Sequence, residues 1–107
     1  MNPVEALLAA LGSCQCIAAA SSAKSQGIDL KEFWVDLEGD LGIDGSPRDD
    51  PSVRSGYQEV RFTMHIKTDA SQDKVEAFQK LIESRCPVGD SLGKGVTIKP
   101  ATIVIER

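Results

Sequence analysis

The stretch that decides the fold is "NPVEALLAALGSCQCIAAASS", residues 2–22. It predicts a long helix with Asn2 as the N-cap, proline at the first helical position and an acidic residue in the first turn. We expect this helix to continue to about Ser25 and to stop at Gly27. Small and apolar residues occupy nearly all of its circumference, which is typical of a central helix covered on several sides.

The rest of the sequence alternates between strand and helix patterns. Apolar residues recur at every second position in residues 32–41 and 57–69, which predicts two half-buried strands. Residues 69–85 show helical spacing with Ser71 as a cap, and residues 97–107 predict a third strand. The expected inward-facing residues are Phe33, Val35, Leu37, Val60, Phe62, Met64, Ile66, Val75, Phe78, Leu81 or Ile82, Ala101, Ile103 and Ile105.

Residues 39–56 separate the first two predicted strands and are rich in Gly, Asp, Pro and Ser. They are too long for a tight hairpin turn, so we interpret them as a mobile or functional loop. The order helix, strand, strand, helix, strand indicates an α+β domain. Three strands give little cover to a long apolar helix. We therefore expect the missing surface to come from strands preceding Met1 in a longer parent or from a second subunit.

Size and composition limit the function classes. The chain has 107 residues, which suits one domain over residues 1–107. Its net charge is −4 and it has no basic stripe, which argues against nucleic acid as a partner. A cleaved signal would need a positive residue ahead of its apolar segment, whereas the first basic residue is Lys24. Serines and a glutamine interrupt that segment well before the ~20 apolar residues of a membrane span.

Three cysteines could be packing residues, metal ligands or a redox pair. Their odd number and spacing indicate a reducing compartment, hence a cytoplasmic protein. Cys14 and Cys16 lie about 200° apart on a helix, which disfavours a disulfide between them and a zinc site needing four converging ligands. Cys14 lies on the inward face, and Cys16 fits a packing role. Cys86 precedes Pro87, so we expect it to cap a short helix whose N-terminus lowers the thiol pKa.

Two other side chains have weaker claims to function. His65 is the only histidine and lies on the polar face of its predicted strand, where exposure is the ordinary state. A cysteine–histidine nucleophile pair therefore finds little support. Trp34 fits a core or interface residue better than a platform for a ligand.

The motifs "NPVEALLAALGSC" (residues 2–14) and "RCPVGDSL" (residues 85–92) together resemble the OsmC/Ohr family. Its members are osmotically induced and organic-hydroperoxide-resistance proteins, small thiol-dependent peroxidases, and the resemblance covers essentially the whole chain. It implies an α+β fold in which a long central helix packs on a bent antiparallel sheet. It also implies an intertwined homodimer, and the family's N-terminal strands are not found in this sequence.

The resemblance further implies catalytic roles for two thiols. Cys14 would be the thiolate that attacks an organic hydroperoxide, and Cys86 would resolve the resulting sulfenic acid as a Cys14–Cys86 disulfide. A small or protein dithiol would reduce that bridge, and no bound cofactor is implied. An apolar wall beside the thiol would favour organic hydroperoxides over hydrogen peroxide.

The chain departs from the family pattern at two positions. In the peroxidase branches an arginine from strands before the helix lies beside the reactive cysteine and is held by a helix glutamate. No such arginine is in this sequence, and Val4 stands where the glutamate usually follows Asn-Pro. Glu5 is the candidate for that role, or a first-turn helix charge. It precedes Cys14 by nine residues, about 180° and ~13 Å, and so could act only through a bridging group.

Three functions are therefore compared. The leading one is thiol-dependent reduction of organic hydroperoxides, and whether the chain is an enzyme is left open. The alternative is a non-catalytic OsmC-like module that binds a small apolar ligand or serves as an interaction domain. The third is a structural domain with inert thiols. The separation of Cys14 and Cys86 distinguishes them best, because a redox pair requires the two sulfurs to meet.

Overall fold

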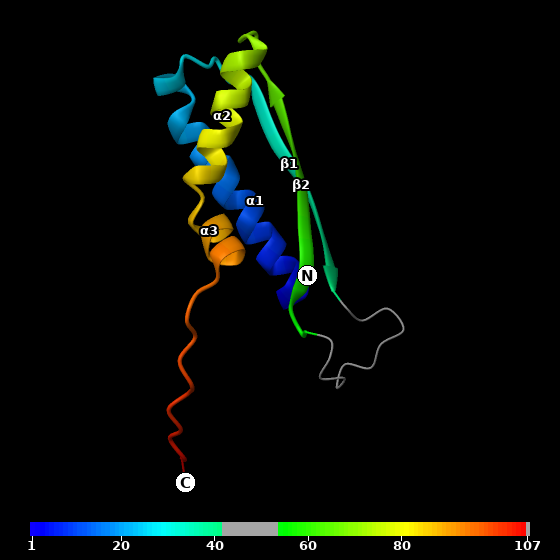
Figure 1. Cartoon of the computed structure of the whole chain (residues 1–107), viewed down its shortest axis with the longest axis vertical. Helices are drawn as coiled ribbons and strands as arrows, with labels where there is room; N and C mark the ends of the chain where they lie inside the picture. Colours follow the sequence, from blue (N-terminus) through cyan, green and yellow to red (C-terminus); the bar gives the residue numbers. More distant parts are fainter. Residues whose placement is uncertain (42–53, 107) are drawn as a thin grey trace.

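The structure is a computed structural model that describes residues 1–41 and 54–106. Helices lie on one face of a two-stranded antiparallel sheet, and the C-terminal residues extend away from both (Figure 1). The predicted α+β class is confirmed. The elements are α1 (Pro3–Ser22), the 3₁₀ turn η1 (Lys24–Gln26), β1 (Glu32–Leu41), β2 (Tyr57–Lys67), α2 (Gln72–Ser84) and α3 (Pro87–Lys94).

Helix α1 begins as the sequence predicts and ends at Ser22, earlier than the expected Ser25, while Gly27 is the stop that the sequence predicts. The Asn2 side chain accepts a hydrogen bond from the Glu5 backbone N–H at 2.8 Å, which satisfies one of the free donors of the first turn. The last turn tightens into η1, and Gly27 then adopts a left-handed conformation with φ 69°. Because these signals are local, the sequence alone contains them.

Strands β1 and β2 pair over their whole length. Phe33 lies opposite Ile66, and Leu37 lies opposite Phe62. Exposed and half-buried residues alternate along β1, which confirms the predicted period of two. β1 extends to Leu41, so the predicted loop over residues 39–56 begins later than expected. Residues 42–53 of that loop lie outside the described residues.

The core lies between α1, α2 and the inner face of the sheet. Phe78 and Ile82 of α2 are fully buried against the small residues of α1, among them Ala19. The short side chains of α1 let α2 approach closely, which is why this helix needs alanines where an amphipathic surface helix would have leucines. Ser71 caps α2 by accepting from the Lys74 N–H. The predicted apolar stripe of α2 is confirmed.

The predicted third strand is wrong. Residues 95–106 have no regular secondary structure, and the side chains of Ile98, Ile103 and Val104 are 86%, 81% and 74% exposed. Alternation of apolar residues gives a segment the preference for a strand, but a strand forms only beside another that supplies its hydrogen bonds. Within the described residues the sheet holds β1 and β2 alone.

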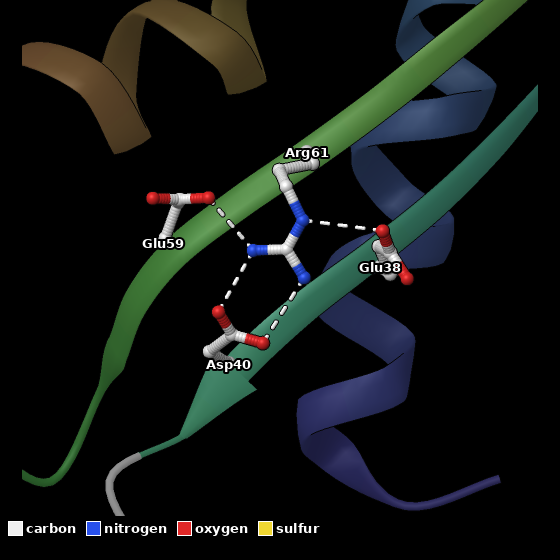
Figure 2. A network of polar contacts seen from close by, with 4 residues as sticks. All are labelled: Glu38, Asp40, Glu59 and Arg61. Atoms are coloured by element: carbon white, nitrogen blue, oxygen red, sulfur yellow. Dashed lines mark hydrogen bonds and ion pairs between the residues drawn. The ribbon is translucent and has the colours of Figure 1, made fainter.

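Arg61 of β2 forms hydrogen bonds to two residues of β1 on the sheet face that points away from α1 (Figure 2). It donates to Glu38 at 3.1 Å, to Glu59 at 2.7 Å and to both carboxylate oxygens of Asp40 at 2.7 and 3.0 Å. The hydrogen bonds from Arg61 lower the pKa of the Asp40 carboxyl. Since these groups are exposed, the network stabilises the hairpin only slightly.

Tyr57 fastens the start of β2 to the first turn of α1. Its hydroxyl donates to the Val4 carbonyl oxygen at 2.6 Å. The ring reaches α1 by crossing Gly39 of β1, where an added Cβ would lie 2.4 Å from ring atom Cε1. Gly39 therefore leaves the space that the ring occupies.

We expect Gly39→Ala to lower the free energy of unfolding by about 1–3 kcal/mol, because the methyl group displaces the Tyr57 ring and breaks its hydrogen bond to α1. Denaturant unfolding followed by circular dichroism measures the change. The matched control is Gly93→Ala in α3, where nothing lies within 4 Å of an added Cβ and the change should be neutral or stabilising. Equal effects of the two substitutions would contradict this account of Gly39.

Candidate functional site

The fold brings Cys14 of α1 near Cys86 at the N-terminus of α3. Both cysteines are free thiols, and Cys14 lies close enough to Cys86 to raise the pKa of its thiol. They are far apart in sequence, and the packing of α3 on α1 makes them neighbours. Cys14 is half-buried and Cys86 is 1% exposed. A redox pair requires such a neighbouring arrangement of two thiols.

Cys86 also caps α3, as the sequence predicts. Its Sγ accepts from the Gly89 backbone N–H at 3.3 Å, and the helix begins at Pro87. Gly89 brings its backbone close to both helices at this point. An added Cβ would lie 3.4 Å from the Cys86 sulfur and 3.6 Å from the Leu11 side chain.

The expected lowering of the Cys86 pKa is wrong. Burial raises the pKa of this thiol, the neighbouring Cys14 side chain raises it further, and the Gly89 N–H opposes the change only in part. The sequence shows the helix N-terminus but not the depth at which it lies, and desolvation outweighs the cap here. Cys86 is therefore the member of the pair that is suited to keep its proton.

A cavity of about 500 Å³ opens between α1, α2, α3 and β2, and of the cysteine pair it is Cys86 that lines it. Its volume falls in the range of small-molecule sites. One part of its wall is apolar and another part carries polar and charged groups. The apolar side chains are Leu7, Leu11, Val60, Phe62 and Leu92, and the polar or charged ones are Gln15, Arg54, Tyr57, Gln58, Glu59, Glu83 and Cys86.

Glu5 does not join the cysteine pair. It is exposed in the first turn of α1, and nine residues of continuous helix separate it from Cys14, about 13 Å along the axis. A negative charge at this position stabilises the helix, because the N-terminus of a helix carries a partial positive charge. Its predicted role beside Cys14 is not tested by this arrangement, since a bridging group would still be needed.

Sequence reasoning missed two residues of the cavity wall. Arg54 places a guanidinium group there, and no sequence pattern had pointed to it. Gln15 is 2% exposed, and its Oε1 has no hydrogen-bond partner among the described residues. One signal in the sequence could have identified Gln15. It lies four residues after Leu11 on the inward face of the helix, where an amide is unexpected.

His65 and Trp34 lie on the opposite face of the sheet. Their rings stack with centroids 4.6 Å apart, and His65 Nε2 lies 2.8 Å from Asp36 Oδ2. Trp34 is 47% exposed, so the expectation of a core residue is wrong, while an interface role stays a prediction. In residues 1–41 and 54–106, no three His, Cys, Asp or Glu side chains are grouped as metal ligands.

Comparison with known proteins gives the family. The model of the OsmC-like protein family matches residues 1–101. The chain belongs to the OsmC-like family. Among curated proteins, no sequence matches this member.

Solved structures of OsmC-like proteins share the fold. An OsmC-like protein from Mycoplasma pneumoniae aligns with a TM-score of 0.76 at 22% identity, covering 87% of this chain and 62% of its own. An OsmC-like hydroperoxide resistance protein from Jannaschia sp. CCS1 aligns with a TM-score of 0.79 at 17% identity, covering 97% and 67%. The chain thus spans about two thirds of the length of these proteins.

We expect Cys14→Ala to lower the pKa of Cys86. The substitution removes the Cys14 side chain, whose nearness raises that pKa, and leaves the burial that raises it most. The rate of Cys86 alkylation by iodoacetamide, followed by mass spectrometry across pH, should therefore show a lower midpoint. Cys16→Ala is the control and should leave the midpoint in place. An unchanged or higher midpoint in Cys14→Ala would contradict the influence of Cys14 on the Cys86 thiol.

Proposed function

We propose that the chain is a thiol-dependent peroxidase that reduces organic hydroperoxides. One observation carries the proposal: two free thiols from distant parts of the sequence lie close together, and one of them, Cys86, lines a partly apolar cavity. Membership of the OsmC-like family supports it, and one structural neighbour is described as a hydroperoxide resistance protein.

The proposed reaction begins at Cys14. Its thiolate attacks the terminal oxygen of the hydroperoxide, the O–O bond breaks, and the alkoxide leaves as the alcohol after taking a proton from solvent. Cys14 is then a sulfenic acid. The Cys86 thiol condenses with it, forming the Cys14–Cys86 disulfide and releasing water. An external dithiol returns two electrons and restores both thiols, so no bound cofactor takes part.

The surroundings of the pair suit these roles. Burial and the nearby Cys14 side chain raise the pKa of Cys86, which fits its role as the resolving thiol rather than the one that attacks the peroxide. Arg54 brings positive charge to the cavity, where it would favour a thiolate. Leu7, Leu11 and Phe62 would hold the alkyl group of the substrate.

The test is consumption of cumene hydroperoxide with dithiothreitol as reductant. We expect Cys14→Ser to lower kcat/KM about a thousandfold or more, because the nucleophile is lost. Cys86→Ser should stop at a Cys14 sulfenic acid, which dimedone traps for detection by mass spectrometry. Cys16→Ser is the control and should keep full activity. Activity that survives in Cys14→Ser would refute the mechanism, and a wild type that binds but does not consume hydroperoxide would be the non-catalytic module.

We also propose that the chain forms a homodimer in the cytoplasm. α1 is long and apolar enough to cross a membrane by length and composition, and 28% of its most apolar stretch is buried in the chain. Ile17 on α1 is 70% exposed, and the apolar residues of the 95–106 segment are exposed as well. A second copy would cover these surfaces, as burial of apolar area requires. Three free cysteines suit a reducing compartment.

Light scattering after size-exclusion chromatography should give twice the chain mass of 11.5 kDa. We expect Ile17→Glu to weaken dimerisation at least about tenfold, because it places a charge in the apolar contact. Lys80→Glu, at an exposed position of α2, serves as the control and should leave the mass unchanged. A monomeric wild type at micromolar concentration would contradict the proposal.

A further inference from the structure

We infer that Gln15 is a substrate-binding residue whose Oε1 accepts a hydrogen bond from the hydroxyl end of the molecule in the cavity. The ligand class is therefore an apolar molecule that carries one O–H group, such as an alkyl hydroperoxide or the alcohol that forms from it. The identity of that O–H group as a hydroperoxide rests on the proposed function, whereas the binding site does not.

The first observation is an unpaired acceptor in a buried position. Gln15 is 2% exposed, and its Oε1 has no hydrogen-bond partner in the part of the chain that the structure describes. A buried carbonyl oxygen without a donor costs free energy that an apolar residue of the same shape would not cost. A ligand that donates a hydrogen bond would remove this cost once a rotation of the Gln15 amide turns the buried Oε1 toward the cavity.

The second observation is the place of Gln15 in the cavity. Its side chain shares the wall with Cys86, and it follows Cys14 directly in the sequence. Leu7, Leu11 and Phe62 form apolar wall in the same cavity. A ligand whose carbon skeleton packs on these residues can present its O–H group to Gln15 close to the thiol pair.

The chemistry of the acceptor selects among ligands. Alcohols and hydroperoxides carry the hydrogen that Oε1 lacks, whereas ethers, ketones and hydrocarbons do not. Holding the O–H group of a hydroperoxide also fixes the O–O bond relative to the thiols, which is the positioning that a substitution reaction at oxygen requires. Gln15 would thus contribute to selectivity as well as affinity.

The experiment is a double cycle of ligand and side chain that needs no turnover. Dissociation constants of 2-phenyl-2-propanol and of isopropylbenzene are measured on the reduced protein by ligand-observed NMR, for the wild type and for Gln15→Leu. We expect the ratio of the two constants to change about 3- to 10-fold in favour of the hydrocarbon when Gln15 is replaced. Gln26→Leu is the matched control, because Gln26 is an exposed glutamine of η1 outside the cavity wall, and it should leave the ratio unchanged.

The outcomes separate this inference from the peroxidase proposal. An unchanged ratio in Gln15→Leu, an equal change in Gln26→Leu, or no binding of either compound to the wild type would overturn it. Thermal unfolding verifies that Gln15→Leu is folded, and we expect no loss of stability since the unpaired acceptor disappears. If that variant unfolds, Gln15→Met repeats the cycle. A shifted ratio in a protein that consumes no hydroperoxide would leave the inference standing and refute the peroxidase.

Discussion

The contact between α1 and the N-terminus of α3 determines the rest of the site. Cys86 stays in place because its sulfur accepts the Gly89 N–H and because α3 begins at Pro87 directly after it. The same contact buries the thiol and sets it against Cys14. The N-terminus of α3 thus determines where the Cys86 sulfur lies, that its pKa is raised, and that Cys14 is its neighbour. Helices α1 and α3 also contribute to the wall of the cavity beside it.

Features that depend on neighbouring residues could be predicted from the sequence. Asn2, Ser71 and Cys86 cap their helices as expected, and the alternation in β1 gives the correct faces. The C-terminal strand failed because its apolar alternation describes a preference, whereas strand formation requires a partner that residues 1–41 and 54–106 do not supply. Trp34 failed as a core residue for a related reason, since the sheet face it occupies is left uncovered in the described chain.

The candidate site was predictable only in part. Resemblance to a family named the two thiols, and the structure brings them together. The pKa direction of Cys86 could not be derived, because desolvation depends on the depth of a thiol in the folded chain. Gln15 and Arg54 were missed because a cavity wall is assembled from separate elements, and of the two only Gln15 carries a local signal, an amide on the inward face of α1.

The sulfur of Cys86 takes part in two interactions, since it caps the N-terminus of α3 and lies next to the Cys14 thiol. Any covalent change at this atom alters the acceptor on which the Gly89 amide depends. The oxidation state of Cys86 and the order of the first turn of α3 are therefore thermodynamically linked. A change at the thiol should alter the stability of the backbone hydrogen bond at Gly89. Slower or faster amide proton exchange at Gly89 would register that linkage without any reagent that reacts with sulfur.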